Sequence, residues 1–181
     1  MKRANYLIIA TLAMSLSSLS AAQTFAGTTT GAPTWTRPIA NGNAPPTSLS
    51  GVGVNVPYQA TLVSVSASGS YTFDMVAATG WDTYAFLYTD PFSSVAPLTN
   101  ILIGNDDEPN SLNSRFSLNL TSGTQYVFVG TGFDSVEFGD YRLEVTSQVG
   151  TATFGAVPEP ASMTALAVGG LALLRRRRAS K

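Results

Sequence analysis

Carboxylates are the side chains with the most scope for chemistry in this 181-residue chain, and they are densest at Asn105-Asp106-Asp107-Glu108. Ca²⁺ prefers carboxylate, amide and backbone oxygens, with about six to eight of them per ion. The cluster therefore marks Asn105, Asp106 and Asp107 as candidate calcium ligands, which Asp82 and Asp140 could join in the folded chain. The alternative is a plain turn, in which Asn and Asp side chains bond their own backbone. The sequence favours the turn, because the carboxylates lack EF-hand spacing.

The chain contains no histidine and no cysteine. This composition excludes Ser-His-Asp and Cys-His catalysis, disulfide bonds and the usual zinc sites. A hydrolase would have to use two carboxylates that face each other across roughly 5–10 Å, and no sequence feature selects such a pair. We therefore expect a non-catalytic protein with no cofactor beyond the candidate calcium. The alternative is a small secreted carboxylate-dependent hydrolase acting on polysaccharide.

The charge of the central region excludes one class of partner. Between Phe25 and Ala156 the chain carries three arginines, ten acids and no lysine, which gives a formal charge of −7. A domain with this charge repels nucleic acid and anionic lipid and attracts cations. We expect no nucleic-acid partner.

Apolar residues in the centre of the chain follow the two-residue period of strands and show no helical period. Trp81–Tyr88 and Tyr126–Val129 are apolar on both faces, as in central strands. Alternating or short apolar segments occur at Thr61–Val65, Tyr71–Met75, Leu98–Ile103, Phe116–Leu120 and Tyr141–Val145. About seven short strands separated by Gly and Asn-Asp turns predict an all-β fold. We expect a single antiparallel, jelly-roll-like β-sandwich over residues 57–148.

Both ends of the chain carry the marks of targeting segments. Met1–Ala22 is predicted to be a secretory signal peptide, with basic residues at its start and an apolar stretch at Tyr6–Leu19. Small residues before Gln23 predict cleavage between Ala22 and Gln23. Residues 23–56 are rich in Gly, Pro and Thr and are interpreted as a linker and entry to the domain, and residues 149–156 as a second linker.

Residues 157–181 combine three motifs in a fixed order. Val157, Pro158, Glu159 and Pro160 come first, the apolar run Ala161–Leu174 follows, and Arg175, Arg176, Arg177 and Arg178 close the run. The prolines keep the first motif extended and accessible. The apolar run predicts a short transmembrane helix of about 21 Å, against a hydrocarbon core of about 30 Å. The arginines form a membrane stop signal on the cytoplasmic side. Because the predicted helix is shorter than the hydrocarbon core, we expect it to be a weak anchor.

This arrangement resembles the PEP-CTERM sorting tail of Gram-negative bacteria. The resemblance implies that exosortase, a membrane-embedded enzyme, recognises and removes the tail after the general secretion machinery has exported the chain. The precursor would be anchored in the inner membrane and face the periplasm. The processed protein would lie at the cell surface or in extracellular polysaccharide. The alternative is an ordinary C-terminal membrane anchor that stays uncut.

A second resemblance covers residues 57–146. Five short motifs carry it, namely Trp81-Asp82-Thr83-Tyr84, Gly104-Asn105-Asp106-Asp107, Asn113-Ser114-Arg115-Phe116, Gly123-Thr124-Gln125-Tyr126 and Gly139-Asp140-Tyr141-Arg142-Leu143. In this order they look like the bacterial pre-peptidase C-terminal domain, a non-catalytic β-sandwich often carried by secreted hydrolases. No peptidase domain accompanies it here, so the resemblance implies a structural or binding module.

Overall fold

The computed structural model describes residues 22–156, which form ten β-strands and no helix. The strands are β1 (Gln23–Thr28), β2 (Thr34–Trp35), β3 (Val56–Val65), β4 (Gly69–Ala77), β5 (Thr83–Thr89), β6 (Ile101–Asn105), β7 (Ser114–Leu120), β8 (Tyr126–Gly132), β9 (Asp140–Ser147) and β10 (Ala152–Ala156). Within residues 22–156 there is accordingly no helix that could cross a membrane. Most of the predicted signal peptide and the whole predicted tail after Ala156 lie outside the described residues.

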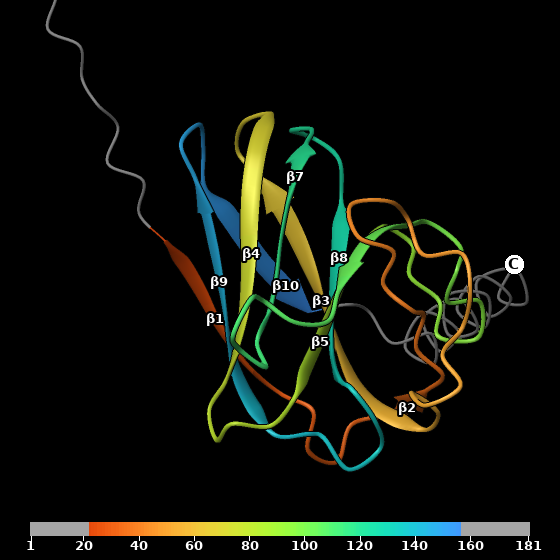
Figure 1. Ribbon diagram of the computed structural model, residues 1–181. Helices are drawn as coiled ribbons and strands as arrows, with labels where there is room; N and C mark the ends of the chain where they lie inside the picture. Colours follow the sequence, from red (N-terminus) through yellow and green to blue (C-terminus); the bar gives the residue numbers. More distant parts are fainter. Residues whose placement is uncertain (1–21, 157–181) are drawn as a thin grey trace, which may run out of the picture.

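The strands form two antiparallel sheets that pack as two layers (Figure 1). One sheet has the order β1-β9-β4-β7, and the other has the order β10-β3-β8-β5-β6 with β2 beside β3. All seven strands expected from the hydrophobic pattern are present, with bounds shifted by a few residues. The prediction of an all-β antiparallel fold is confirmed, and the arrangement is that of a β-sandwich.

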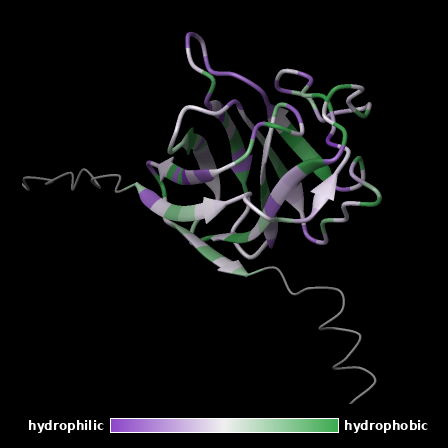
Figure 2. Cartoon of the chain, turned by 90° about the horizontal axis from the view of Figure 1, so that it is seen from below, coloured by the Kyte–Doolittle hydropathy of each residue, from purple (hydrophilic) through white to green (hydrophobic). Residues whose placement is uncertain are grey.

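The main hydrophobic core lies between the two sheets. Tyr71, Phe73 and Met75 alternate along β4, and all three are buried. The Phe73 ring stacks on Phe116 at 5.3 Å and on Phe128 at 6.1 Å between ring centroids, so one ring joins both sheets. Figure 2 shows the hydrophobic and hydrophilic residues alternating along several strands. The two-residue period places one set inside and the other outside.

A second core covers the outer face of the larger sheet. It contains Trp35 together with Tyr84, Phe86 and Tyr88 of β5, all buried. Phe92, in the loop after β5, packs edge-on against Trp35 at 5.6 Å and Tyr88 at 4.9 Å. This second core explains why β5 and β8 are buried on both faces, as the sequence predicted.

The interpretation of residues 23–56 and 149–156 as linkers is wrong for their strands. β1 pairs with β9 along its whole length, from Gln23↔Val145 to Thr28↔Asp140. β10 pairs with β3, from Ala152↔Val65 to Ala156↔Thr61. Both segments are rich in Gly, Thr and Ala and lack the apolar pattern of a strand. They form strands because their backbones pair with strands distant in the sequence. The folded unit therefore extends over residues 23–156 rather than 57–148.

Candidate functional site

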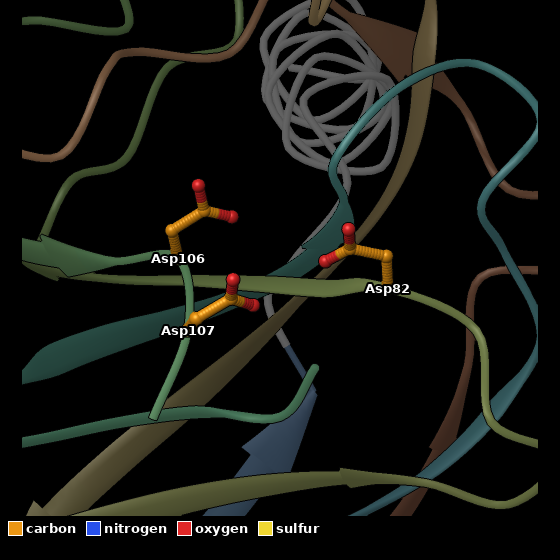
Figure 3. A group of neighbouring side chains, drawn as sticks. All are labelled: Asp82, Asp106 and Asp107. Atoms are coloured by element: carbon orange, nitrogen blue, oxygen red, sulfur yellow. The ribbon is translucent and has the colours of Figure 1, made fainter. Parts of the chain in front are cut away.

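The antiparallel pairing of β5 and β6 brings three carboxylates together at one end of the larger sheet. Asp82 directly precedes β5, and Asp106 and Asp107 directly follow β6. Because Ala85 pairs with Asn105, the start of one strand lies beside the end of the other. One oxygen from each of the three carboxylates lies within 4.8 Å of the other two. Figure 3 shows the three groups directed toward a common space. We call Asp82, Asp106 and Asp107 the carboxylate triad.

Hydroxyl groups hold the loop that carries two of these carboxylates. The Ser114 hydroxyl donates to the Asp106 carbonyl at 2.7 Å, and the Ser114 N–H donates to Thr83 Oγ1 at 2.8 Å. The Thr83 N–H donates to the Leu112 carbonyl at 2.9 Å. Both Thr83 and Ser114 are buried. The triad is therefore positioned by a closed network between β5 and β7.

The structure brings together some of the residues expected at this site and separates others. Asp106 and Asp107 lie with Asp82, as the sequence analysis considered. Asn105 Oδ1 accepts the Arg115 N–H at 2.9 Å, so its oxygen connects β6 to β7. Glu108 forms an ion pair with Arg115 at 3.0 Å. Asp140 begins β9 and is not a member of the triad.

Two oxygens of the triad are buried without a hydrogen-bond partner, namely Asp82 Oδ1 and Asp106 Oδ1. A buried charged oxygen without a partner is costly, because it has lost its water. Burial raises the pKa of Asp82 to about 6, and the nearby carboxylates of Asp107, Asp106 and Glu137 add to this rise. Burial and Asp107 also raise the pKa of Asp106. The triad thus favours protons or another cation.

Arg37 is the cationic side chain that acts on the triad, and the sequence analysis did not assign it a role. Only 2% of its surface is exposed, and burial lowers its pKa. Its guanidinium donates to the Phe133 carbonyl at 2.7 and 3.0 Å and lies 3.7 Å from the Tyr84 ring centroid. No ion pair within residues 22–156 joins Arg37 to the triad. Its positive charge therefore offsets the triad's repulsion only in part.

One sequence signal pointed to Arg37. It is the only charged residue between Gln23 and Phe73. A lone charge in so long an uncharged segment stands out, and the structure buries it, which is rare for arginine.

Comparison with known proteins identifies the tail. The family model of the PEP-CTERM protein-sorting motif matches residues 156–178. No curated protein matches the chain. The motif begins at Ala156, the last residue of β10, whereas Val157–Pro160 and Arg175–Arg178 lie outside the described residues. The chain therefore carries a PEP-CTERM sorting motif, which implies an exported protein that exosortase processes.

Proposed function

We propose that this protein is a non-catalytic β-sandwich exported by the general secretion machinery and left at the cell surface or in extracellular polysaccharide. Before processing, Ala161–Leu174 anchors it in the inner membrane with the sandwich facing the periplasm. The observation that carries the proposal is the position of the sorting motif, which begins at the last residue of the sandwich. The whole folded unit therefore lies ahead of the motif and remains when the tail is removed.

The arrangement of the acids supports a binding or structural role over hydrolysis. A glycosidase needs two carboxylates facing across a cleft that admits the sugar. A surface groove of about 630 Å³ beside the triad is lined by Asp107 and Glu108, but not by Asp82 or Asp106. The unpartnered oxygens of Asp82 and Asp106 are buried, where a polysaccharide has no access.

The resemblance to the pre-peptidase C-terminal domain belongs to the same proposal. Asn113 and Arg115, two residues of its motifs, contact β4 in this chain. Asn113 Oδ1 accepts the Ala77 N–H at 3.1 Å, and Arg115 lies 3.8 Å from Asp74 and 3.0 Å from Glu108. These contacts hold the 106–113 loop against β4, which supports a role of the motif in the fold.

We further propose that the carboxylate triad binds Ca²⁺. Three carboxylates can supply three to six oxygens, and backbone carbonyls and water complete the usual coordination of about six to eight. A cation at the triad would give the buried oxygens of Asp82 and Asp106 the partner they lack. It would also relieve the repulsion that raises the pKa of Asp82.

Calcium is expected to raise the melting temperature of the protein at pH 7.5. At a hundredfold excess over the dissociation constant, the gain in the free energy of unfolding is about 2.7 kcal/mol. For a domain of this size the gain corresponds to roughly 8–12 °C. The rise should shrink below about pH 6, because protons then compete for Asp82. Scanning calorimetry with calcium, magnesium or a chelator between pH 5 and pH 8, roughly spanning that pKa, measures these effects.

Asp82→Asn and Asp140→Asn form a matched pair of variants, since each removes one negative charge. The folded-state pKa of Asp82 is raised, so its charge destabilises the metal-free fold increasingly as pH rises from about 4 through about 6. Asp82→Asn should therefore stabilise the metal-free protein at pH 7.5 and abolish the response to calcium. Asp140→Asn, at an exposed position, should keep that response. A calcium response that persists in Asp82→Asn would place the ion elsewhere.

Mass spectrometry of the protein recovered from its native host tests the proposed export and sorting. We expect the extracellular or surface form to begin at Gln23 and to lack Arg175–Arg178, because both targeting segments are removed. The full-length mass in the same fraction would contradict the proposal.

A further inference from the structure

One edge of β3 is covered by two different strands with a gap between them. β10 pairs with β3 as far as Ala156↔Thr61, and β2 pairs with β3 at Thr34↔Pro57 and Trp35↔Val56. Tyr58, Gln59 and Ala60 have no partner strand on this edge within the described residues. The gap forms a groove of about 560 Å³, which we call the β3 notch. Its lining includes Pro33, Tyr58, Ala60, Phe92 and Ala156.

The backbone in the β3 notch is directed for strand pairing. The N–H of Ser66, just after β3, donates to the Thr151 carbonyl at 3.0 Å, and the Tyr58 N–H donates to the Pro33 carbonyl at 3.0 Å. Even-numbered residues of β3 therefore turn their backbone groups toward this edge, since these groups alternate along a strand. Ala60 belongs to this set and lies opposite no described strand. The notch thus offers a donor and an acceptor to one more residue.

The chain itself leads into the β3 notch. Ala156, the last residue of β10, lines it and is also the first residue matched by the sorting motif. If β10 continued in the same register, the next residue, Val157, would fall opposite Ala60 in a hydrogen-bonded position. Pro158 would then fall opposite Gln59 in a non-hydrogen-bonded position, where the missing N–H would cost nothing. Such a ladder would end there, because the Tyr58 N–H already donates to the Pro33 carbonyl.

The side chains around the notch fit these two residues. Tyr58 and Phe92 are half-buried and lie edge-to-face at 5.6 Å between ring centroids, so together they form an apolar wall. Val157 would lie on their side of the sheet, since it has the same parity in the register as Tyr58. Pro158 would lie on the opposite side, near Gln59 and Phe25. The part of the notch that the structure describes has no charged lining residue.

We propose that Val157 and Pro158 dock in the β3 notch as a continuation of β10, so that the folded domain holds the sorting motif before processing. The proposal rests on the proposed role of the motif as the exosortase substrate. A docked motif has its backbone paired with β3, and an enzyme that binds it extended must first separate it. Removal of the tail would then compete with docking.

Cysteine pairs test the register directly, because the chain contains no native cysteine. The full-length variant Ala60→Cys/Val157→Cys, made in a host without exosortase, should form an intramolecular disulfide under mild oxidation. The matched control is Leu62→Cys/Gly155→Cys, at residues that pair between β3 and β10. A Cβ on Gly155 would lie 3.7 Å from Leu62 Cβ, a distance that suits a disulfide. The off-register variant Gln59→Cys/Val157→Cys places its sulfurs on opposite faces and should react slowly.

Peptide mapping by mass spectrometry reads the outcome. Docking predicts that Ala60→Cys/Val157→Cys oxidises at a rate close to that of the β3–β10 control and at least tenfold faster than the off-register variant. A rate no faster than the off-register variant would overturn docking. Disulfides between two chains would also overturn it and assign the notch to a second copy. Neither result affects the sorting role, which fails separately if the unaltered chain keeps its tail in a host that has exosortase.

Discussion

Alanine substitution of Pro158, Glu159 and Pro160 together is expected to leave the full-length chain in the membrane fraction of a host that has exosortase. In the proposed membrane-anchored precursor, the two prolines would prevent this segment from continuing the apolar helix, and Glu159 would keep a charge outside the bilayer. Alanine is the best helix former, so the substitutions would extend the helix proposed for Ala161–Leu174 toward the sandwich. The variant would lose the recognition motif and gain a longer membrane anchor.

Fractionation and immunoblotting with antibodies against the folded domain measure this effect. The unaltered chain should leave the membrane fraction in the host with exosortase and remain there in a host without it. Lys181→Ala is a suitable control, since it lies beyond the residues that match the motif. If the protein from the exosortase host retains Arg175–Arg178 at steady state, the tail is a plain C-terminal anchor.

A fragment of residues 57–148 is expected to lose cooperative unfolding, whereas residues 22–156 should melt in one transition. The shorter fragment lacks β1, β2 and β10, and with them the cover of β3 and β9. It also lacks Trp35, which is 4% exposed in the second core. Loss of one buried tryptophan costs about 3–5 kcal/mol, against a total stability of about 5–15 kcal/mol for a domain. The additional loss of three strands is expected to exceed the stability that remains after the loss of Trp35.

Thermal melts followed by circular dichroism distinguish the contributions of the N-terminal and C-terminal strands to stability. Fragments 22–148 and 57–156 remove one end each, so they separate the effect of β10 from that of β1, β2 and Trp35. We expect the larger loss from the N-terminal deletion, because it removes Trp35 as well as two strands. A cooperative melt of residues 57–148 with the melting temperature of residues 22–156 would contradict the assignment of both ends to the fold.

The strands that could be predicted from the sequence are those whose own pattern of apolar side chains shows which residues are buried. Tyr71, Phe73 and Met75 lie on one face of β4 because a strand alternates its side chains at every residue, whatever its partner. The both-face burial of β5 was also predicted from its continuous apolar run. What covers its outer face was not, because Trp35 and Phe92 come from segments that carry no strand pattern.

Only the tertiary structure revealed strands β1 and β10 and the carboxylate triad. The backbone of Gln23–Thr28 finds its partners more than a hundred residues later in β9, and no property of a Gly- and Thr-rich segment specifies so distant a partner. The cluster at Asp106 and Asp107 was visible because the two are adjacent in sequence. Asp82 lies beside them because β5 and β6 run antiparallel, and the resulting repulsion and burial raise its pKa to about 6. The sequence by itself determined the sorting motif, since a linear segment is recognised by its order of residues. Only the tertiary structure showed that this motif starts at the end of a paired strand.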